Sequence, residues 1–390
     1  MRTAKYIKRL LFKEWLPLIA VFLIVAVLTA VIAASSHSFY DGGTFETAAM
    51  TWPSSIFAIV MPFFVYSYRF TRIGGDTYYQ LPFKEKQFKN IRVLTGLVAV
   101  LAVFVVAFLI GFTMYTILYY QAPMTKDFGY DYTLEKATVN PPVALLAFVS
   151  FLVLCSGVYF VTCAAVSLTN KLPSAMIFTA VVHCLLGFTV VAFTAYISEF
   201  STAGSSLLSD VGLASMFAAP NFLGMNLLPM QFGYGTMFCP NTDNYSLFDT
   251  ITIQLSRGQS SPVLGTLIGM GIFDILVFGG ATYLTLFSDE PSGEYNGVNG
   301  TRNKYLNFVI YATSILMALG TTSLLRSSIF VYALLVVLYI AGLYVTTSIF
   351  LGTFKVGRYH AIFIAGSGFL MILTPIVTSI IDFALWSTGH

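Results

Sequence analysis

The chain has 390 residues, of which 57% are hydrophobic and only 9% are charged, and its formal net charge at pH 7 is +3. Soluble domains carry about 25% charged residues, so this composition excludes a surface that faces water on all sides. A chain in lipid must satisfy its backbone hydrogen bonds internally, as helices or a closed barrel. A barrel would show alternating segments of ~10 residues, whereas unbroken apolar runs of ~20 residues indicate spanning helices. The sequence therefore predicts an all-α polytopic membrane protein.

Nine apolar runs are long enough to be expected as spans. They cover residues 16–35, 51–68, 93–120, 142–169, 174–196, 262–287, 305–325, 328–352 and 361–386. The first run follows basic residues, as the apolar part of a signal peptide would, but it is longer than the 7–15 residues typical of such a part. We therefore interpret it as a retained span.

The distribution of Lys and Arg predicts the orientation, because these residues stay on the cytoplasmic side. With the N-terminus inside, 16 of the 20 Lys and Arg residues fall in inner segments and four fall in outer ones. The four outer residues are Lys126, Lys136, Arg257 and Arg326. The sequence thus predicts a multi-pass protein of the plasma membrane with a cytoplasmic N-terminus and, after nine spans, an extracellular C-terminus.

Two long connections divide the chain. The predicted outer loop 197–261 has an apolar middle, which Pro220 and Pro229 break into pieces too short to span, as in re-entrant or interfacial helices. It is either a static cover of the outer mouth or a lid, whose apolar residues include Phe217, Phe222 and Leu227. The polar, Gly-rich segment 288–304 predicts a cytoplasmic linker before residues 305–390, which hold three additional spans.

Residues 1–15 predict a cytoplasmic amphipathic helix. Ala4, Ile7, Leu11 and Trp15 recur at helical spacing on one face, and on another face stand three basic residues, Lys5, Arg9 and Lys13. Such a helix suits an anionic inner leaflet, or it serves only as a topology signal and anchor.

The predicted inner loop between the second and third spans holds a short helix. Gly74 and Gly75 break the incoming helix, Asp76 can cap a new one, and Pro82 ends it. Its exposed aromatic residues suit docking into another protein or a place at the headgroup level. The docking residues expected in this segment, 76–88, are Asp76, Tyr78, Tyr79, Gln80, Leu81, Pro82, Phe83 and Lys84.

These features together resemble a known family. The chain begins with a basic helix and a hairpin of two spans. An inner segment with the pattern Asp-x-x-x-x-Leu-Pro-x-Lys-x-Lys-Gln follows, formed by Asp76, Leu81-Pro82, Lys84 and Lys86-Gln87. A large outer loop then precedes the sixth span. This pattern over residues 1–287 resembles the permease subunit of ABC exporters, in the six-span superfamily that includes bacterial antibiotic and lantibiotic exporters. Residues 289–294 also resemble a Pro-Ser stretch of some relatives but lack its arginine, and the three C-terminal spans depart from the six-helix plan.

The resemblance implies a transport subunit, not an enzyme, in which the segment 76–88 is a coupling helix that contacts a separate ATP-binding subunit. The implied partners are two copies of that subunit, a second permease of the same or another sequence, and membrane lipids. Nucleic acid is not an implied partner. This chain has no G-x-x-x-x-G-K-[ST] loop to bind phosphates. ATP and magnesium would therefore bind the partner subunit, and no cofactor is expected on this chain. The resemblance alone implies export, and the few charges suit an amphipathic or hydrophobic substrate, such as a peptide, antibiotic or lipid.

Few ionisable residues stand within the expected spans. Asp274 and His183 are candidates for a substrate path, because a charge at mid-bilayer costs ~2.5–3.5 kcal/mol on insertion scales; packing between helices is the alternative for both. Two other functions stay open. An ion-coupled carrier would need charged relays and inverted repeats, and a lipid-modifying enzyme would need a cluster of polar side chains. The four His and four Cys show no metal-ligand spacing.

Overall fold

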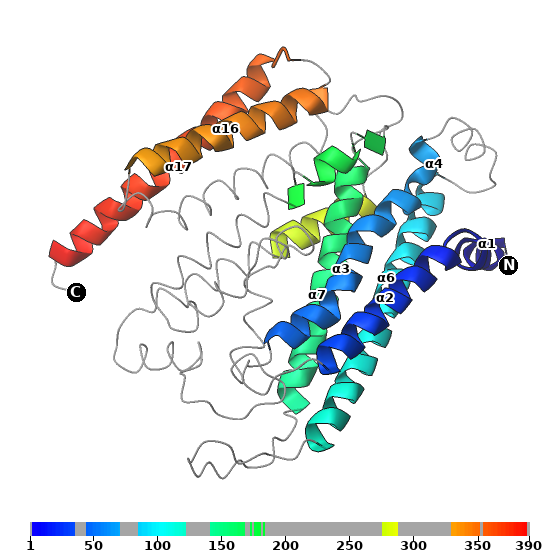
Figure 1. Ribbon diagram of the computed structural model, residues 1–390. Coiled ribbons are helices and arrows are strands. Elements are labelled where there is room, and N and C mark those ends of the chain that lie inside the picture. Colours follow the sequence, from blue (N-terminus) through cyan, green and yellow to red (C-terminus); the bar gives the residue numbers. More distant parts are fainter. Residues whose placement is uncertain are drawn as a thin grey trace, which may run out of the picture. The chain divides into compact units, whose positions relative to one another are not determined.

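The computed structural model describes residues 2–35, 44–70, 85–121, 141–167, 172–173, 175–180, 182–183, 275–287, 329–351 and 354–387. Within these ranges the chain is helical apart from short turns, and none of the described residues forms a strand (Figure 1). The all-α class is therefore confirmed for the described part of the chain. The chain divides into two units, with residues 1–65, 81–160 and 224–261 in one and 66–80, 161–223 and 262–390 in the other.

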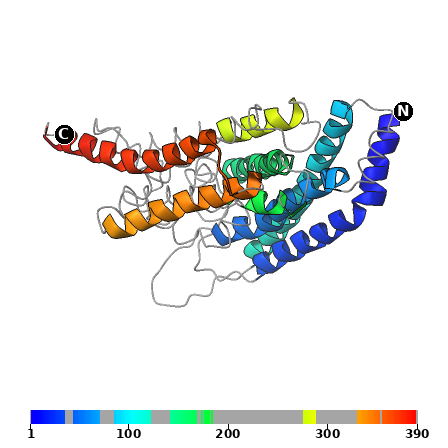
Figure 2. The same ribbon diagram turned by 90° about the horizontal axis from the view of Figure 1, so that it is seen from above.

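The N-terminal region consists of three consecutive helical segments. The helix α1 (Arg2–Arg9) continues into the π-helix η1 (Leu10–Glu14), and α2 (Leu16–Ser35) follows after Trp15. The direction of the chain changes by 61° at this junction, which is visible at the N-terminal end in Figure 2. The bounds of α2 are those expected for the first span, because an uninterrupted apolar run ends there at Ser35.

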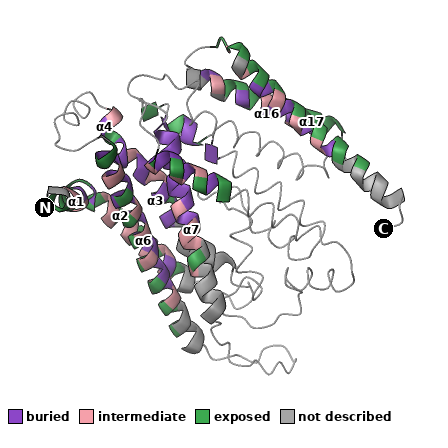
Figure 3. Ribbon diagram, turned by 180° about the vertical axis from the view of Figure 1, so that it is seen from behind, coloured by how far each residue is buried: buried purple, intermediate pink, exposed green. Residues whose placement is uncertain are grey.

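Three helices of the first unit pack side by side. Helix α3 (Thr44–Val65) contacts both α2 and α6 (Glu85–Gln121), and α2 also contacts α6 (Figure 1). Most described side chains of α3 are buried (Figure 3), and the rings of Phe22 and Phe57 stack with centroids 4.7 Å apart. Helix α3 begins seven residues before the expected span 51–68 and is followed by the short α4 (Ser67–Phe70).

Helix α6 is longer than a bilayer is thick. Its 37 residues at 1.5 Å each extend about 55 Å, against a hydrocarbon core of ~30 Å. The stretch Lys86–Met114 has the length and hydropathy of a spanning helix. The charged first turns, which include Lys89 and Arg92, are therefore the end that suits a position beyond the apolar layer.

An aromatic cluster joins α6 to helix α7 (Pro141–Val166). Phe104 and Phe108 lie against Phe148 with ring centroids 5.7 Å and 5.1 Å apart, and the buried Cys155 and Ala30 complete the cluster. Cys155 and Cys163 are buried and form no disulfide within the described residues, as expected of small packing residues.

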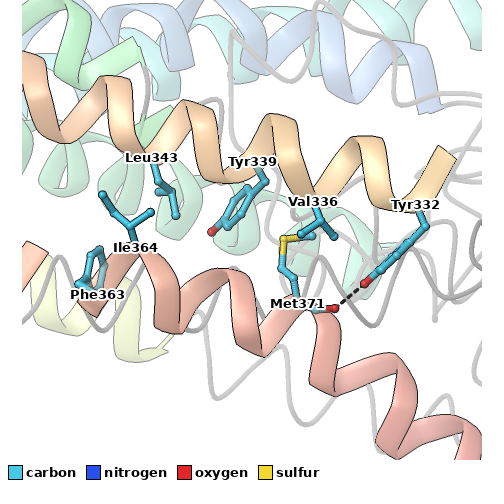
Figure 4. Packing of buried hydrophobic residues seen from close by; sticks show 7 residues of the cluster. All are labelled: Tyr332, Val336, Tyr339, Leu343, Phe363, Ile364 and Met371. Carbon is cyan, nitrogen blue, oxygen red and sulfur yellow. Dashed lines mark hydrogen bonds between the residues drawn. The ribbon is translucent and has the colours of Figure 1, made fainter. Parts of the chain in front are cut away.

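Helices α16 (Ile329–Leu351) and α17 (Arg358–Ser387) form a hairpin in the second unit. Tyr332, Val336, Tyr339 and Leu343 recur at intervals of three and four residues and face Met371 and neighbouring residues of α17 (Figure 4). The hydroxyl of Tyr332 donates to the carbonyl oxygen of Met371 at 2.5 Å. The two helices match the expected spans 328–352 and 361–386 to within three residues.

Two described helices, Lys86–Met114 and His360–Val377, are long and apolar enough to cross a membrane, and the bent pair Ala4–Glu14 and Leu16–Ile32 passes the same criterion together. Four shorter apolar helices accompany them: Pro53–Val65, Phe151–Val166, Ile275–Leu286 and Ile329–Val345. The structure is thus that of a helical chain with candidate spans, and it does not confirm nine. The expected span 305–325 lies outside the described residues.

Candidate functional site

Arg92 stands at the centre of a polar site that joins α6 to α3 and to the N-terminal helix. It lies in the second turn of α6 and is only 5% exposed. A buried guanidinium is costly unless its donors are paired. Its position is also informative, because α6 begins at Glu85, directly after the predicted coupling residues.

Two donors of Arg92 bind the end of α3. Its Nε donates to the carbonyl oxygen of Val65 at 2.8 Å, and one terminal nitrogen donates to the carbonyl oxygen of Phe64 at 2.9 Å. The last four carbonyls of a helix lack partners within the helix, and a cation there also offsets the negative end of the helix dipole. Arg92 is therefore a C-terminal cap of α3 that is supplied by α6.

The other terminal nitrogen of Arg92 faces the N-terminal helix. It donates to the hydroxyl of Tyr6 at 3.1 Å and lies 3.7 Å from the Glu14 carboxylate. The guanidinium also lies over the rings of Trp15 and Phe88, 5.5 Å and 5.7 Å from their centroids, within the range of cation–π attraction. We call Arg92, Tyr6, Glu14, Trp15 and Phe88, with the two carbonyls of α3, the Arg92 node.

The carboxylate of Glu14 is shared between Arg92 and Arg9. One oxygen of Glu14 faces Arg92 and the other lies 3.6 Å from Nε of Arg9. The side chain of Arg9 is 69% exposed and that of Glu14 37% exposed. Ion pairs open to solvent contribute little stability, so the carbonyl bonds of Arg92 dominate. Burial raises the pKa of Tyr6, against the opposing effect of Arg92. The Tyr6 hydroxyl therefore stays protonated at neutral pH and accepts the Arg92 bond as a neutral group.

The π-helix η1 sets the faces of the N-terminal helix. The N–H of Trp15 donates to the carbonyl oxygen of Leu10 at 2.9 Å, five residues back, and this wider turn buries Leu10 as well as Trp15. Ala4 is exposed and Ile7 and Leu11 are half-buried, so the protein itself covers only the Trp15 end of the expected apolar face. Single π turns within helices often occur at functional sites.

Helices α3, α6 and α7 pack closely at Gly96, one turn after Arg92 in α6. A Cβ atom at Gly96 would lie 2.5 Å from the hydroxyl oxygen of Tyr159 and 2.7 Å from a methyl of Val65. The same Tyr159 hydroxyl donates to the carbonyl oxygen of Val93 at 2.7 Å. The absence of a side chain at Gly96 therefore lets α3 and α7 approach α6 where the node begins.

Most residues predicted for the functional site lie outside the described residues. These are Asp76, Tyr78, Tyr79, Gln80, Leu81, Pro82, Phe83, Lys84, Phe217, Phe222, Leu227 and Asp274. Their roles stay predictions.

His183 is the one predicted site residue whose side chain is described. It is buried, and its Nε2 lies 2.8 Å from the hydroxyl of Thr162. Its Nδ1 has no hydrogen-bond partner within the described part of the chain. The contact with Thr162 gives His183 a packing role, and its place on a substrate path stays a prediction.

The sequence alone does not predict the node. Arg92 is one of the 16 Lys and Arg residues of the predicted inner segments, and nothing in the sequence links it to Tyr6 or Glu14. The spacing indicates only the contact with Phe88, which precedes Arg92 by one helical turn. An arginine near aromatic residues at the start of a long apolar helix suits a cation–π site.

Comparisons of the chain with protein-family models, with curated proteins and with solved structures gave no match.

Proposed function

We propose that this chain is the membrane-spanning permease subunit of an ATP-driven ABC transporter that exports an amphipathic or hydrophobic substrate. The proposal rests on the resemblance of residues 1–287 and on one structural observation, the Arg92 node. Two nitrogens of the Arg92 guanidinium donate to carbonyls at the end of α3, and the third donates to Tyr6 of the N-terminal helix. A permease that receives force from an ATPase needs helix ends that move as one body.

The node supports this role by its place in the chain. Residues 71–84 connect α4, which follows α3, with α6. Arg92 therefore cross-links the helices on both sides of the predicted coupling segment. We assign Tyr79 and Leu81 as its main contacts with the ATP-binding subunit. Aromatic side chains are enriched in interfaces between proteins, which makes the tyrosine the stronger candidate.

The rest of the assignment follows the charge bias and the apolar composition. Nine spans, a cytoplasmic N-terminus and an extracellular C-terminus in the plasma membrane are proposed on the distribution of Lys and Arg. Two ATP-binding subunits and a second permease, identical or different, complete the transporter. Asp274 and His183 are assigned to the substrate path, and the segment 213–232 to a cover on the outer side.

The coupling contact can be tested by substitution. Replacing Tyr79 and Leu81 by Ala is expected to weaken recovery of the ATP-binding subunit with the affinity-tagged chain, or to uncouple ATP hydrolysis from transport. The matched control replaces Tyr130 and Tyr132, in a segment predicted outside, by Ala. Unchanged recovery and unchanged coupling in the first variant would exclude this segment as the contact.

The outer cover has a separate test. A lid over an export route has to move when substrate leaves, so hydrogen exchange in residues 213–232 is expected to differ between the nucleotide-free and the ATP-trapped complex. Equal protection in the two states would assign these residues to a static cover.

A further inference from the structure

The outward side of α1 and η1 carries an exposed basic surface with an aromatic residue in it. Lys5, Lys8, Arg9, Phe12 and Lys13 are all exposed, and Phe12 is 61% exposed. Lys5, Lys8 and Arg9 are spaced by three and four residues along one side of α1, and Phe12 and Lys13 are exposed on the π turn that follows. Leu10 and Trp15 are buried on the protein side. We call these five exposed residues the basic face.

The charge of this region is unbalanced. Residues 2–14 contain five basic residues and one acidic residue, Glu14. Arg9 is within ion-pair distance of Glu14, and Lys5, Lys8 and Lys13 have no ion pair with any described residue. The basic face thus presents at least three lysines whose charge is not neutralised by the described part of the chain.

The direction of the helix favours a membrane surface as the partner. The helix pair Ala4–Glu14 and Leu16–Ile32 is bent by 61°, so α1 and η1 leave the apolar helix α2 at a steep angle. If α2 crosses the bilayer, this bend directs the basic face along the plane of the headgroups. Helices in that plane combine Lys and Arg with a few aromatic or apolar side chains, and aromatic residues are enriched at the headgroup level.

A protein partner fits the same surface less well. Lysines are depleted in the cores of protein interfaces, whereas apolar and aromatic residues form such cores. Here the one large apolar side chain, Phe12, stands among four cations. Phosphate groups of lipids can pair with each cation while the ring enters the interfacial layer, so a bilayer satisfies both kinds of side chain.

We propose that the basic face binds the phosphate headgroups of anionic phospholipids in the leaflet where α2 begins, and that this binding acts on the Arg92 node through Glu14. Glu14 shares its two oxygens between Arg9 at 3.6 Å and Arg92 at 3.7 Å. A lipid phosphate at Arg9 competes with Glu14 for that guanidinium. Glu14 then pairs with Arg92 alone, which strengthens the hold of the N-terminal helix on α3 and α6.

Lipid binding is measured on the purified full chain in neutral detergent. The probes are phosphatidylglycerol and phosphatidylcholine that carry the same fluorescent acyl chain. The wild type is expected to prefer phosphatidylglycerol. Replacing Lys5, Lys8 and Lys13 by Gln leaves the Arg9–Glu14 pair intact and is expected to weaken phosphatidylglycerol binding about 100-fold, since each cation near an anionic surface contributes about fivefold.

The matched control replaces Lys355 and Arg358, which are exposed between α16 and α17, by Gln. It is expected to keep the wild-type preference. Equal binding of the two lipids by the wild type, unchanged binding by the triple variant, or an equal loss in the control would each overturn the proposal. All substituted side chains are exposed, and size-exclusion chromatography verifies that the variants are folded.

The link through Glu14 has its own measurement. Phosphatidylglycerol is expected to raise the Tm of the wild type, and less so at high salt, because the contacts are ionic and exposed. In the Glu14→Gln variant, phosphatidylglycerol still binds but the rise in Tm is expected to be smaller. An equal rise in both proteins would remove the link to Arg92.

Discussion

The Nε of Arg92 lies 2.8 Å from the carbonyl oxygen of Val65, so that the first turns of α6 hold the last turn of α3. The two residues are 27 positions apart, and residues 71–84 stand between them in the chain. The same guanidinium holds Tyr6 of the N-terminal helix. Three separate segments thus depend on one side chain.

Replacing Arg92 by Met is expected to destabilise the protein by on the order of 2–4 kcal/mol, because the two α3 carbonyls and Tyr6 lose charge-assisted hydrogen bonds. Arg92→Lys is expected to recover only part of this loss, since an ammonium group cannot reproduce the planar fork of donors. Thermal unfolding in detergent measures both. Arg358→Met, at an exposed position of α17, is the control. If Arg92→Met unfolds no more easily than this control, Arg92 does not stabilise the junction.

The close packing at Gly96 predicts a second effect. Ala normally favours a helix by about 1 kcal/mol over Gly, yet Gly96→Ala is expected to destabilise by about 1–3 kcal/mol, because overpacking forces neighbouring groups apart. Gly342→Ala in α16, where the added Cβ would meet no atom within 4 Å, is expected to be neutral or stabilising.

The source of the strain at Gly96 can be tested by a second substitution. The nearest atom to the added Cβ is the Tyr159 hydroxyl oxygen. Adding Tyr159→Phe to Gly96→Ala should therefore recover part of the stability. If the effects of the two substitutions on the free energy of unfolding simply add, the Tyr159 hydroxyl is not the cause of the strain.

The hairpin of α16 and α17 depends in part on one hydrogen bond. Tyr332→Phe removes the donor to the Met371 carbonyl and is expected to cost about 1 kcal/mol in the free energy of unfolding. Tyr283→Phe, at a largely exposed tyrosine, serves as the control. Equal unfolding of the two variants would argue against a contribution from this bond.

The predicted topology can be tested by labelling single cysteines in a chain whose Cys155, Cys163, Cys184 and Cys239 are replaced. A membrane-impermeant thiol reagent added outside intact cells is expected to label Asn244→Cys and to leave Lys86→Cys unlabelled. Both positions are expected to react after the membrane is opened. Labelling of position 86 but not 244 in intact cells would invert the orientation.

The sequence predicted helices better than contacts. The α2 bounds followed from one apolar run. Helix α6 begins at Glu85, eight residues before the expected span 93–120, because its first turns are charged and hydropathy marks only the apolar part. The start of α3 was missed because Glu46 and other polar residues precede its apolar part, and hydropathy marks the apolar layer while the helix continues past it. The π turn at Leu10 adds a residue to the helical period, and the spacing of residues 4–15 gives no sign of it.

The Arg92 node could not be derived from spacing. Its members come from three parts of the chain, residues 6–15, 64–65 and 88–92, and meet only because α3 and the N-terminal helix pack on α6. Local patterns carry no information on such a meeting. A single sequence shows that an arginine stands near an apolar segment, but its partners depend on the tertiary arrangement.

The claim that this chain works with an ATP-binding subunit is tested most directly by isolating the tagged chain from its own membrane under mild conditions. The native mass of the complex and its ATPase activity are then measured together. We expect a complex that contains two permease subunits and two ATP-binding subunits, with ATPase activity that vanadate inhibits. A chain recovered alone, or with partners that do not hydrolyse ATP, would contradict the proposed function.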